Sequence, residues 1–239
     1  IDTNGRYIVP PSYDKIDWDE AGFYVVQKDA QLGVIDQLGR KVLNAEYDKI
    51  FFLDDRGFAF SKDGKWGFCN LDASVKTAIQ YLDFKNITNG YLKIQKYNES
   101  GFELLSLETF KVAAVSKVKF AFPYSNGAIV FSVESGKVGL LDKFGNIVLS
   151  PVYQEIAGFK EDFFRVKQNN LWAVVGVGDS YLYPFEYNFI SAPQNNTCIL
   201  IKDEKSAVGT LSGEVISAFD YDEIKWGKND QIHCFKDGA

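Results

Sequence analysis

Short stretches of this chain alternate apolar and polar residues, and the same alternation returns at a regular interval. A Tyr-x-x-(Ile/Phe) motif occurs six times, and a degenerate copy, Lys117 to Phe120, fills the gap between the third and the fourth. Successive motifs are 34, 34, 36, 36, 34 and 34 residues apart, so the chain holds seven units of similar length. The motifs begin at Tyr13, Tyr47, Tyr81, Lys117, Tyr153, Tyr187 and Tyr221.

Further columns keep the same frame. The segment after each motif has two apolar positions around a variable one, such as Tyr24 and Val26 around Val25 in the first unit. In the third unit the variable position is Lys93. One face of this segment is therefore apolar throughout, which is the period-2 pattern of a β-strand. The turn before each motif holds Gly5, Gly39, Ala73, Thr109, Gly145, Asp179 and Gly213.

Turn residues divide each unit into four short strands. The clearest turn is Asp63-Gly64 in the second unit, which predicts a tight hairpin because Gly adopts positive φ without steric cost. The third and fourth units carry two extra residues in this hairpin, at 97–101 and 133–137. No helix-period segment extends beyond about two turns. We therefore predict an all-β protein.

Composition and charge narrow the function. With 46% hydrophobic and 15% aromatic residues, the 239-residue chain has enough apolar side chains for a continuous core. A net charge of −6 argues against binding nucleic acid through a basic surface. No apolar run approaches the ~18–20 residues of a membrane-spanning helix, so we predict no transmembrane segment.

Residue types that carry catalysis or bind metals are scarce. The cysteines Cys69, Cys198 and Cys234 fall in apolar strand columns, so we predict buried free thiols rather than disulfides or metal ligands. His233 is the only histidine, and no nucleophile stands in a recognisable relation to it. We expect no catalytic residue, no metal and no cofactor.

The run Asp-Gly-Lys-Trp-Gly-Phe at 63–68, with Gly-x-x-Val-x-x-x-Tyr-Asp-x-Ile, resembles the bacterial WG (KWG) repeat family. Only Trp66-Gly67 keeps the pair that gives the family its name; Leu32-Gly33, Val138-Gly139 and Trp172-Ala173 keep half of it. The resemblance is specific in units one, two and five, and elsewhere only periodic. It implies a bacterial protein of the cell envelope or a secreted one rather than a cytoplasmic one, and no family catalytic residues exist to transfer.

Seven four-stranded units favour a seven-bladed β-propeller, and an open β-solenoid is the alternative. The chain begins after one Trp-Gly strand and ends before another, so both ends could share the last blade of a ring. Small-angle scattering would distinguish a compact disc from a rod. We expect one domain over 1–239, with repeats at about 1–34, 35–68, 69–104, 105–140, 141–174, 175–208 and 209–239.

Two features are candidates for partner binding. Trp18 and Trp226 share one repeat position in the first and last units, which would be neighbours in a closed ring. Acidic residues also gather at one repeated turn, although a solvated loop face would show the same charge. They are Asp17, Asp19, Glu20, Asp54, Asp55, Glu161, Asp162 and Asp230. A calcium loop is not supported, because the Asp-x-Asp-x-Asp-Gly spacing is missing.

These features favour a non-enzymatic repeat scaffold, expected to be monomeric, that binds a protein partner. The alternative is a carbohydrate-binding module that uses Trp and Tyr side chains at its rim. A second alternative is a propeller-type enzyme acting on glycans, which would need two or three converging carboxylates with shifted pKa values.

Overall fold

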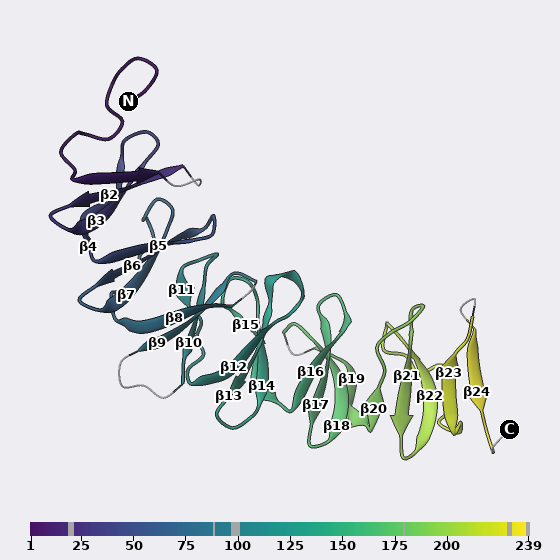
Figure 1. Cartoon of the computed structure of the whole chain (residues 1–239). Helices are drawn as coiled ribbons and strands as arrows, with labels where there is room; N and C mark the ends of the chain where they lie inside the picture. Colours follow the sequence, from purple (N-terminus) through teal and green to yellow (C-terminus); the bar gives the residue numbers. More distant parts are fainter. Residues whose placement is uncertain (19–21, 88, 97–100, 179, 229–230, 238–239) are drawn as a thin grey trace. The chain divides into compact units, whose positions relative to one another are not determined.

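Figure 1 shows the computed structural model of the chain, in which short strands succeed one another along the whole sequence. The structure describes residues 1–18, 22–87, 89–96, 101–178, 180–228 and 231–237. Within these ranges the only helical element is a 3-10 turn, η1 (Ser125–Gly127). The prediction of an all-β fold is confirmed.

The chain divides into two compact parts, each of which spans several repeat units. We call Ile1–Ile129 with Asp142–Asn146 the N-terminal part, and Val130–Leu141 with Ile147–Ala239 the C-terminal part. The strands up to η1 are β1 (Lys15–Trp18), β2 (Phe23–Lys28), β3 (Gln31–Asp36), β4 (Lys41–Tyr47), β5 (Lys49–Leu53), β6 (Gly57–Lys62), β7 (Lys65–Asn70), β8 (Tyr81–Ile87), β9 (Tyr91–Lys96), β10 (Glu103–Ser106), β11 (Lys111–Val112) and β12 (Val118–Pro123). After it come β13 (Ile129–Val133), β14 (Val138–Leu141), β15 (Ile147–Tyr153), β16 (Glu155–Lys160), β17 (Phe163–Gln168), β18 (Leu171–Gly176), β19 (Tyr181–Tyr187), β20 (Phe189–Ile190), β21 (Thr197–Lys202), β22 (Lys205–Thr210), β23 (Glu223–Trp226) and β24 (Ile232–Phe235).

Within each sheet, strands that are neighbours in sequence are neighbours in space. In the N-terminal part β1 to β4 form one sheet and β5 to β11 form a seven-stranded sheet. In the C-terminal part β16 to β19 form a four-stranded sheet, β20 to β22 form a three-stranded one, and β23 pairs with β24. In five of the seven repeats the first strand begins two residues after the Tyr of the repeated motif, as at Lys15, Lys49 and Glu155. The strands therefore follow the repeat predicted from the sequence.

The Tyr of the repeated motif is a packing residue. Tyr47, Tyr81, Tyr153 and Tyr187 are at most 5% exposed. The ring centroid of Tyr47 lies 4.8 Å from that of Phe60, and the Tyr47 hydroxyl accepts a hydrogen bond from Nζ of Lys76. A buried ring offers no open face for stacking, so these four tyrosines hold the core rather than a ligand.

The turn column predicted before each Tyr contains left-handed backbone. Gly5, Gly39 and Gly145 have φ of 77°, 81° and 92°, and Ala73 has φ of 55°. Because side chains disfavour positive φ, Gly is the residue that fits this column. Asp179 lies outside the described residues.

The fourth of these turns differs in its backbone. Thr109 lies in the turn, as predicted, but the left-handed residue is Phe110, at φ of 53°. A bulky side chain rarely adopts this conformation. The ring of Phe110 is 4% exposed and packs in the core with Leu107, so burial of the ring holds the backbone in place.

The residue after the motif Tyr closes the hairpin between the second and third strands. The turn residues Asp63 and Gly64 both have positive φ, as a two-residue type I′ hairpin requires. The side chain of Asp48 accepts a hydrogen bond from the Asp63 amide at 2.8 Å. The same bond recurs as Asp14 with Asp29, Asn188 with Asp203 and Asp222 with Asp237, whereas Gln154 accepts one from Asn170, the second residue of its turn.

The third and fourth units depart from this arrangement for a visible reason. Leu82 and Val118 stand where the other units have the polar acceptor. These are the two units whose hairpins carry extra residues, so the loss of the acceptor and the longer hairpin go together.

We expect Asp48→Ala to lower the free energy of unfolding by about 1 kcal/mol, because the Asp63 amide loses its acceptor. The Asp63 amide should also exchange its hydrogen faster. Asp48→Asn is the control, since Asn188 already fills this role in the sixth unit. Hydrogen exchange of the hairpin measures both effects. Equal exchange in the Ala and Asn variants would contradict the role assigned to the carboxylate.

Candidate functional site

The two tryptophans predicted to bind a partner end equivalent strands. Trp18 is the last residue of β1 and is 56% exposed, with its ring centroid 4.6 Å from that of Tyr24. Trp226 is the last residue of β23 and is half-buried. Trp18 belongs to the N-terminal part and Trp226 to the C-terminal part, so a surface shared by the two side chains stays a prediction.

Large apolar side chains recur on the first strands of the repeats, and the sequence pattern singled out only one of them. We call Trp18, Phe51, Phe120, Phe122 and Phe189 the first-strand aromatics. They lie on β1, β5, β12 and β20, and each is between 42% and 60% exposed. Phe122 has the same spacing from its motif as Trp18, five residues, so this spacing could have identified it.

The acidic residues of the predicted rim that the structure describes are exposed, and part of the acidic character follows from turn geometry. Asp54 and Asp162 have φ of 52° and 59°, a conformation that Asp adopts more readily than most residues. Asp55 and Glu161 are exposed beside them. These four stay candidates for partner contact, because their exposure fits both a solvated turn and a binding rim.

The first unit supplies most of the remaining acidic candidates. Asp17 forms an ion pair with Lys15 at 2.5 Å, and both side chains are exposed. An exposed pair of this kind contributes little stability. Asp19, Glu20 and Asp230 lie outside the described residues.

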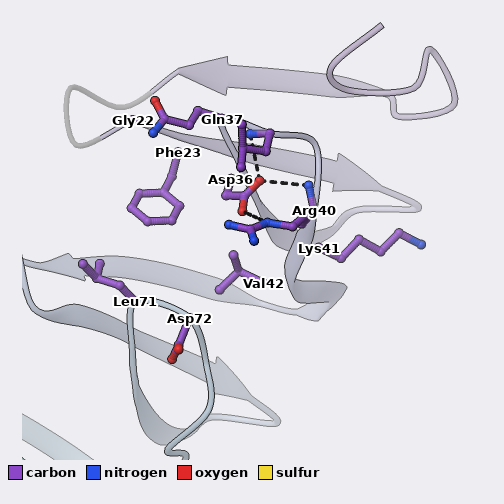
Figure 2. A pocket seen from close by; sticks show the side chains of 10 residues that line it. Gly22, Phe23, Asp36, Gln37, Arg40, Lys41, Val42, Leu71 and Asp72 are labelled. Atoms are coloured by element: carbon purple, nitrogen blue, oxygen red, sulfur yellow. Dashed lines mark hydrogen bonds and ion pairs between the residues drawn. The ribbon is translucent and has the colours of Figure 1, made fainter.

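A cleft of about 500 Å³ opens beside this turn in the first unit. Figure 2 shows its walls: Gly22 and Phe23 follow the acidic turn, Asp36 to Val42 form the turn between β3 and β4, and Leu71 with Asp72 follows β7. The lining is mixed, with apolar Phe23 and Leu71 around a charged pair. The cleft thus connects the predicted rim with two turns of the repeat.

The charged pair is an ordered Asx turn. Oδ1 of Asp36 accepts hydrogen bonds from the amides of Leu38 and Arg40, both at 2.9 Å, and Oδ2 accepts one from Nε of Arg40 at 2.6 Å. Burial raises the pKa of Asp36, but the hydrogen bonds from Arg40 and Leu38 outweigh it and hold the pKa below its usual value. Asp36 is buried while the Arg40 side chain is 74% exposed, so the site offers a guanidinium to solvent.

The same Asx turn recurs in other units. Asp142 accepts hydrogen bonds from the amides of Phe144 and Asn146, both at 2.9 Å. Asp2 accepts them from the amides of Asn4 and Arg6. The carboxylate of Asp36 is therefore a structural group that orders the turn, and the Arg40 side chain is the charged group that this turn presents to the cleft.

Two of the three cysteines match the prediction of buried thiols. Burial raises the pKa of Cys69 to about 12 and that of Cys198 to about 11, so both stay protonated and unreactive at neutral pH. Cys234 contradicts the prediction, because it is exposed. Among the described strands, its own strand β24 pairs only with β23, so the apolar column is uncovered there.

The described residues contain no group of three or more His, Cys, Asp or Glu side chains that could hold a metal ion. None of the elements that the structure describes is a helix long and apolar enough to traverse a lipid bilayer.

Comparison with known protein families identifies one match. The family described as WG containing repeat matches residues 1–30, 33–66 and 139–172. These segments cover units one, two and five, where the resemblance in sequence is strongest. No curated protein sequence matches the chain.

Several solved structures are similar to the chain at low identity. The extracellular domain of a protein described as a hybrid two component system from B. thetaiotaomicron is 10% identical, with a TM-score of 0.32, over 96% of this chain and 38% of that one. PorZ from Porphyromonas gingivalis is 12% identical with a TM-score of 0.29, over 90% and 35%. Virginiamycin B lyase from Staphylococcus aureus is 11% identical with a TM-score of 0.30, over 92% and 83%. The chain thus spans well under half the length of the first two.

Proposed function

Three stretches of this chain are WG-containing repeats, and on that premise we propose that the protein is a non-enzymatic scaffold that binds a protein partner. The observation that carries the proposal is the set of first-strand aromatics. These side chains are between 42% and 60% exposed, whereas the aromatic side chains of Tyr47, Phe58 and Phe60 are buried. Exposed aromatic residues are typical anchors of protein interfaces.

The chemistry of the partner follows from the neighbours of the anchors. Asp17 precedes Trp18, and Asp54 and Asp55 follow the strand that carries Phe51. A partner that fits these aromatics of the N-terminal part therefore has an apolar centre and a basic rim. Charged rims mainly change the association rate and its salt dependence, while buried aromatics provide most of the affinity. In the C-terminal part, Glu161, Asp162 and Trp226 are candidates for a separate partner contact of their own.

Affinity capture from bacterial envelope extracts, quantified by mass spectrometry, tests the proposal. We expect Trp18→Ala with Phe51→Ala to weaken binding of the captured partner about 30-fold or more, as for interface hot spots of ~2 kcal/mol. Asp54→Lys with Asp55→Lys should slow association and reduce its dependence on salt. Tyr181→Ala is the matched control, because Tyr181 is also 56% exposed but lies on a last strand.

Two outcomes would contradict the proposal. Equal capture by the wild type and the Trp18 variant would remove the first-strand aromatics from the interface. Loss of capture in the Tyr181 control alone would move the interface to the last strands. Fractionation of cells would test the accompanying expectation of an envelope or secreted location, and sedimentation would test that of a monomer.

Carbohydrate binding is the second candidate function, and the geometry of Trp18 is the observation that favours it. The indole packs against Tyr24, and its remaining exposed area suits stacking on a sugar ring. A glycan array separates the two functions. Glycan binding that Trp18→Ala abolishes, without capture of any protein, would replace the protein-binding proposal.

A further inference from the structure

A lysine ends or directly follows the second strand in five of the seven repeats, and in three of them its counter-ion is the acidic residue just before the motif Tyr. Nζ of Lys62 lies 3.3 Å from a carboxylate oxygen of Glu46, and Nζ of Lys202 lies 3.1 Å from one of Glu186. In the last unit Lys236 pairs with Asp220 at 2.8 Å in the same way. The repeat thus neutralises this lysine locally.

The first unit keeps the lysine but lacks the acid. Lys28 is the equivalent lysine, and Ser12 stands where Glu46 stands in the second unit. Asp14 is near in sequence, but its carboxylate accepts the hydrogen bond from the Asp29 amide that closes the hairpin. Among the residues that the structure describes, Lys28 forms no ion pair.

A second lysine comes from the last strand of the same sheet. Lys41 begins β4, at a position where several other units carry an apolar residue such as Val75 or Ile147. Figure 2 shows its side chain extending away from the Asp36–Arg40 pair. Within the described part of the chain Lys41 also forms no ion pair. Two uncompensated positive charges therefore belong to one sheet of a chain whose net charge is −6.

Lys28 and Lys41 line the same hollow. Its volume is about 220 Å³, and the other lining residues are Ser12, Tyr13, Asn44 and Ala45. The hydroxyls of Ser12 and Tyr13 and the amide of Asn44 are neutral hydrogen-bond donors. None of the described residues that line it carries a carboxylate. It is distinct from the larger cleft, although Lys41 borders both.

We propose that this hollow binds a small divalent oxyanion of the phosphate or sulfate type. Lysine binds such groups as a point charge, and charge-assisted hydrogen bonds are about twice as strong as neutral ones. Ser12 in place of an acid leaves Lys28 free, and Lys41 in place of an apolar residue doubles the charge. The site is separate from the partner surface proposed above, so either can fail without the other.

Titration of the wild-type chain with inorganic phosphate, at constant ionic strength, tests the site. We expect saturable shifts of the backbone amide signals of Ser12 and Asn44, and binding heat by calorimetry. Sulfate should compete, whereas acetate should bind at least about 5-fold more weakly, because a monoanion engages one lysine fully instead of two.

The decisive variant is Ser12→Glu, which rebuilds the ion pair of the second unit. We expect it to weaken phosphate binding about 10-fold or more, because the new carboxylate pairs with Lys28. Lys41→Val copies the third unit and should weaken binding about 5-fold. The matched control is Glu46→Ser, which frees Lys62 beside Val75 and should create no comparable site, since only one lysine is present.

Each result bears on the proposal. Weaker binding in both Ser12→Glu and Lys41→Val, with the control unchanged, supports it. Unchanged binding in either variant, or no saturable shift in the wild type, overturns it. If Ser12→Glu does not fold, judged by its amide spectrum, the Lys41→Val titration alone decides.

Discussion

Replacing Gly57 with Ala is expected to lower the free energy of unfolding of the N-terminal part by about 3 kcal/mol or more. Gly57 is the buried first residue of β6. A Cβ at this position would lie 2.0 Å from the carbonyl oxygen of Cys69 and 2.6 Å from Cζ of Phe110. A strand carbonyl has no rotamer through which to move aside, so β6 and β7 would have to separate where Gly57 pairs with Asn70.

The effect of Gly57→Ala can be measured by urea unfolding followed by tryptophan fluorescence. Trp172→Phe and Trp226→Phe leave only Trp18 and Trp66, so that fluorescence reports on the N-terminal part. Gly64→Ala is the control: it adds the same methyl group where no described atom lies within 4 Å, and costs about 1 kcal/mol through its φ of 72°. A midpoint for Gly57→Ala no lower than that of the control would show that the strands absorb the methyl group.

The sequence could not reveal the importance of Gly57, because its repeat position holds large aromatic residues in three other units and a glycine again only at Gly127. Phe23, Tyr91 and Phe163 occupy the equivalent place in other units. In the second unit the ring of Phe110 fills that space, arriving from a turn later in the chain. A periodic pattern describes what the units share, and this contact is not shared.

The shared features were predictable for the same reason. The motif Tyr at position 47 and the turn residue Gly39 serve the same physical purpose in each copy, so their columns stand out. The strands and the turns followed from period-2 alternation and from the residues that accept positive φ. Arrangement of the units as a closed ring or an open stack depends on small rotations between sheets and stays a prediction, which small-angle scattering tests.

The candidate site was predictable only in part. Trp18 stood out as a large residue at a repeated position, and its exposure agrees with the hypothesis. The cleft did not, because Phe23, Arg40 and Leu71 come from three separate segments that no spacing rule links. The lysine pair of Lys28 and Lys41 was also missed, because its significance lies in a missing counter-ion, which becomes visible only when the ion pairs of other units are known.

The Gly of the Trp-Gly pair leads to the second large prediction. Gly67 pairs across the sheet with Phe60, and a Cβ on Gly67 would lie 2.6 Å from Cε2 of that ring. In the fifth unit the same position holds Ala173, which is fully buried and pairs with the smaller Val166. The missing side chain of Gly67 therefore makes room for an aromatic ring on the neighbouring strand.

We expect Gly67→Ala to lower the free energy of unfolding of the N-terminal part by about 2 kcal/mol, because the ring of Phe60 is enclosed and must leave its rotamer. Phe60→Val alone should cost about 3 kcal/mol through the cavity it leaves. The double variant copies the pair of the fifth unit, so the new methyl group occupies part of that cavity. Its loss should be smaller than the sum of the two single losses by about 1 kcal/mol or more.

The fluorescence-monitored urea unfolding used for Gly57→Ala measures this coupling. Ala173→Gly is the matched control in the C-terminal part. We expect it to lower the free energy of unfolding by only about 1 kcal/mol, because glycine gives the unfolded chain greater freedom. Strict additivity of Phe60→Val and Gly67→Ala would mean that the two side chains do not compete for space. Coupling of the expected sign would show that Gly67 leaves room for the ring of Phe60 across the sheet.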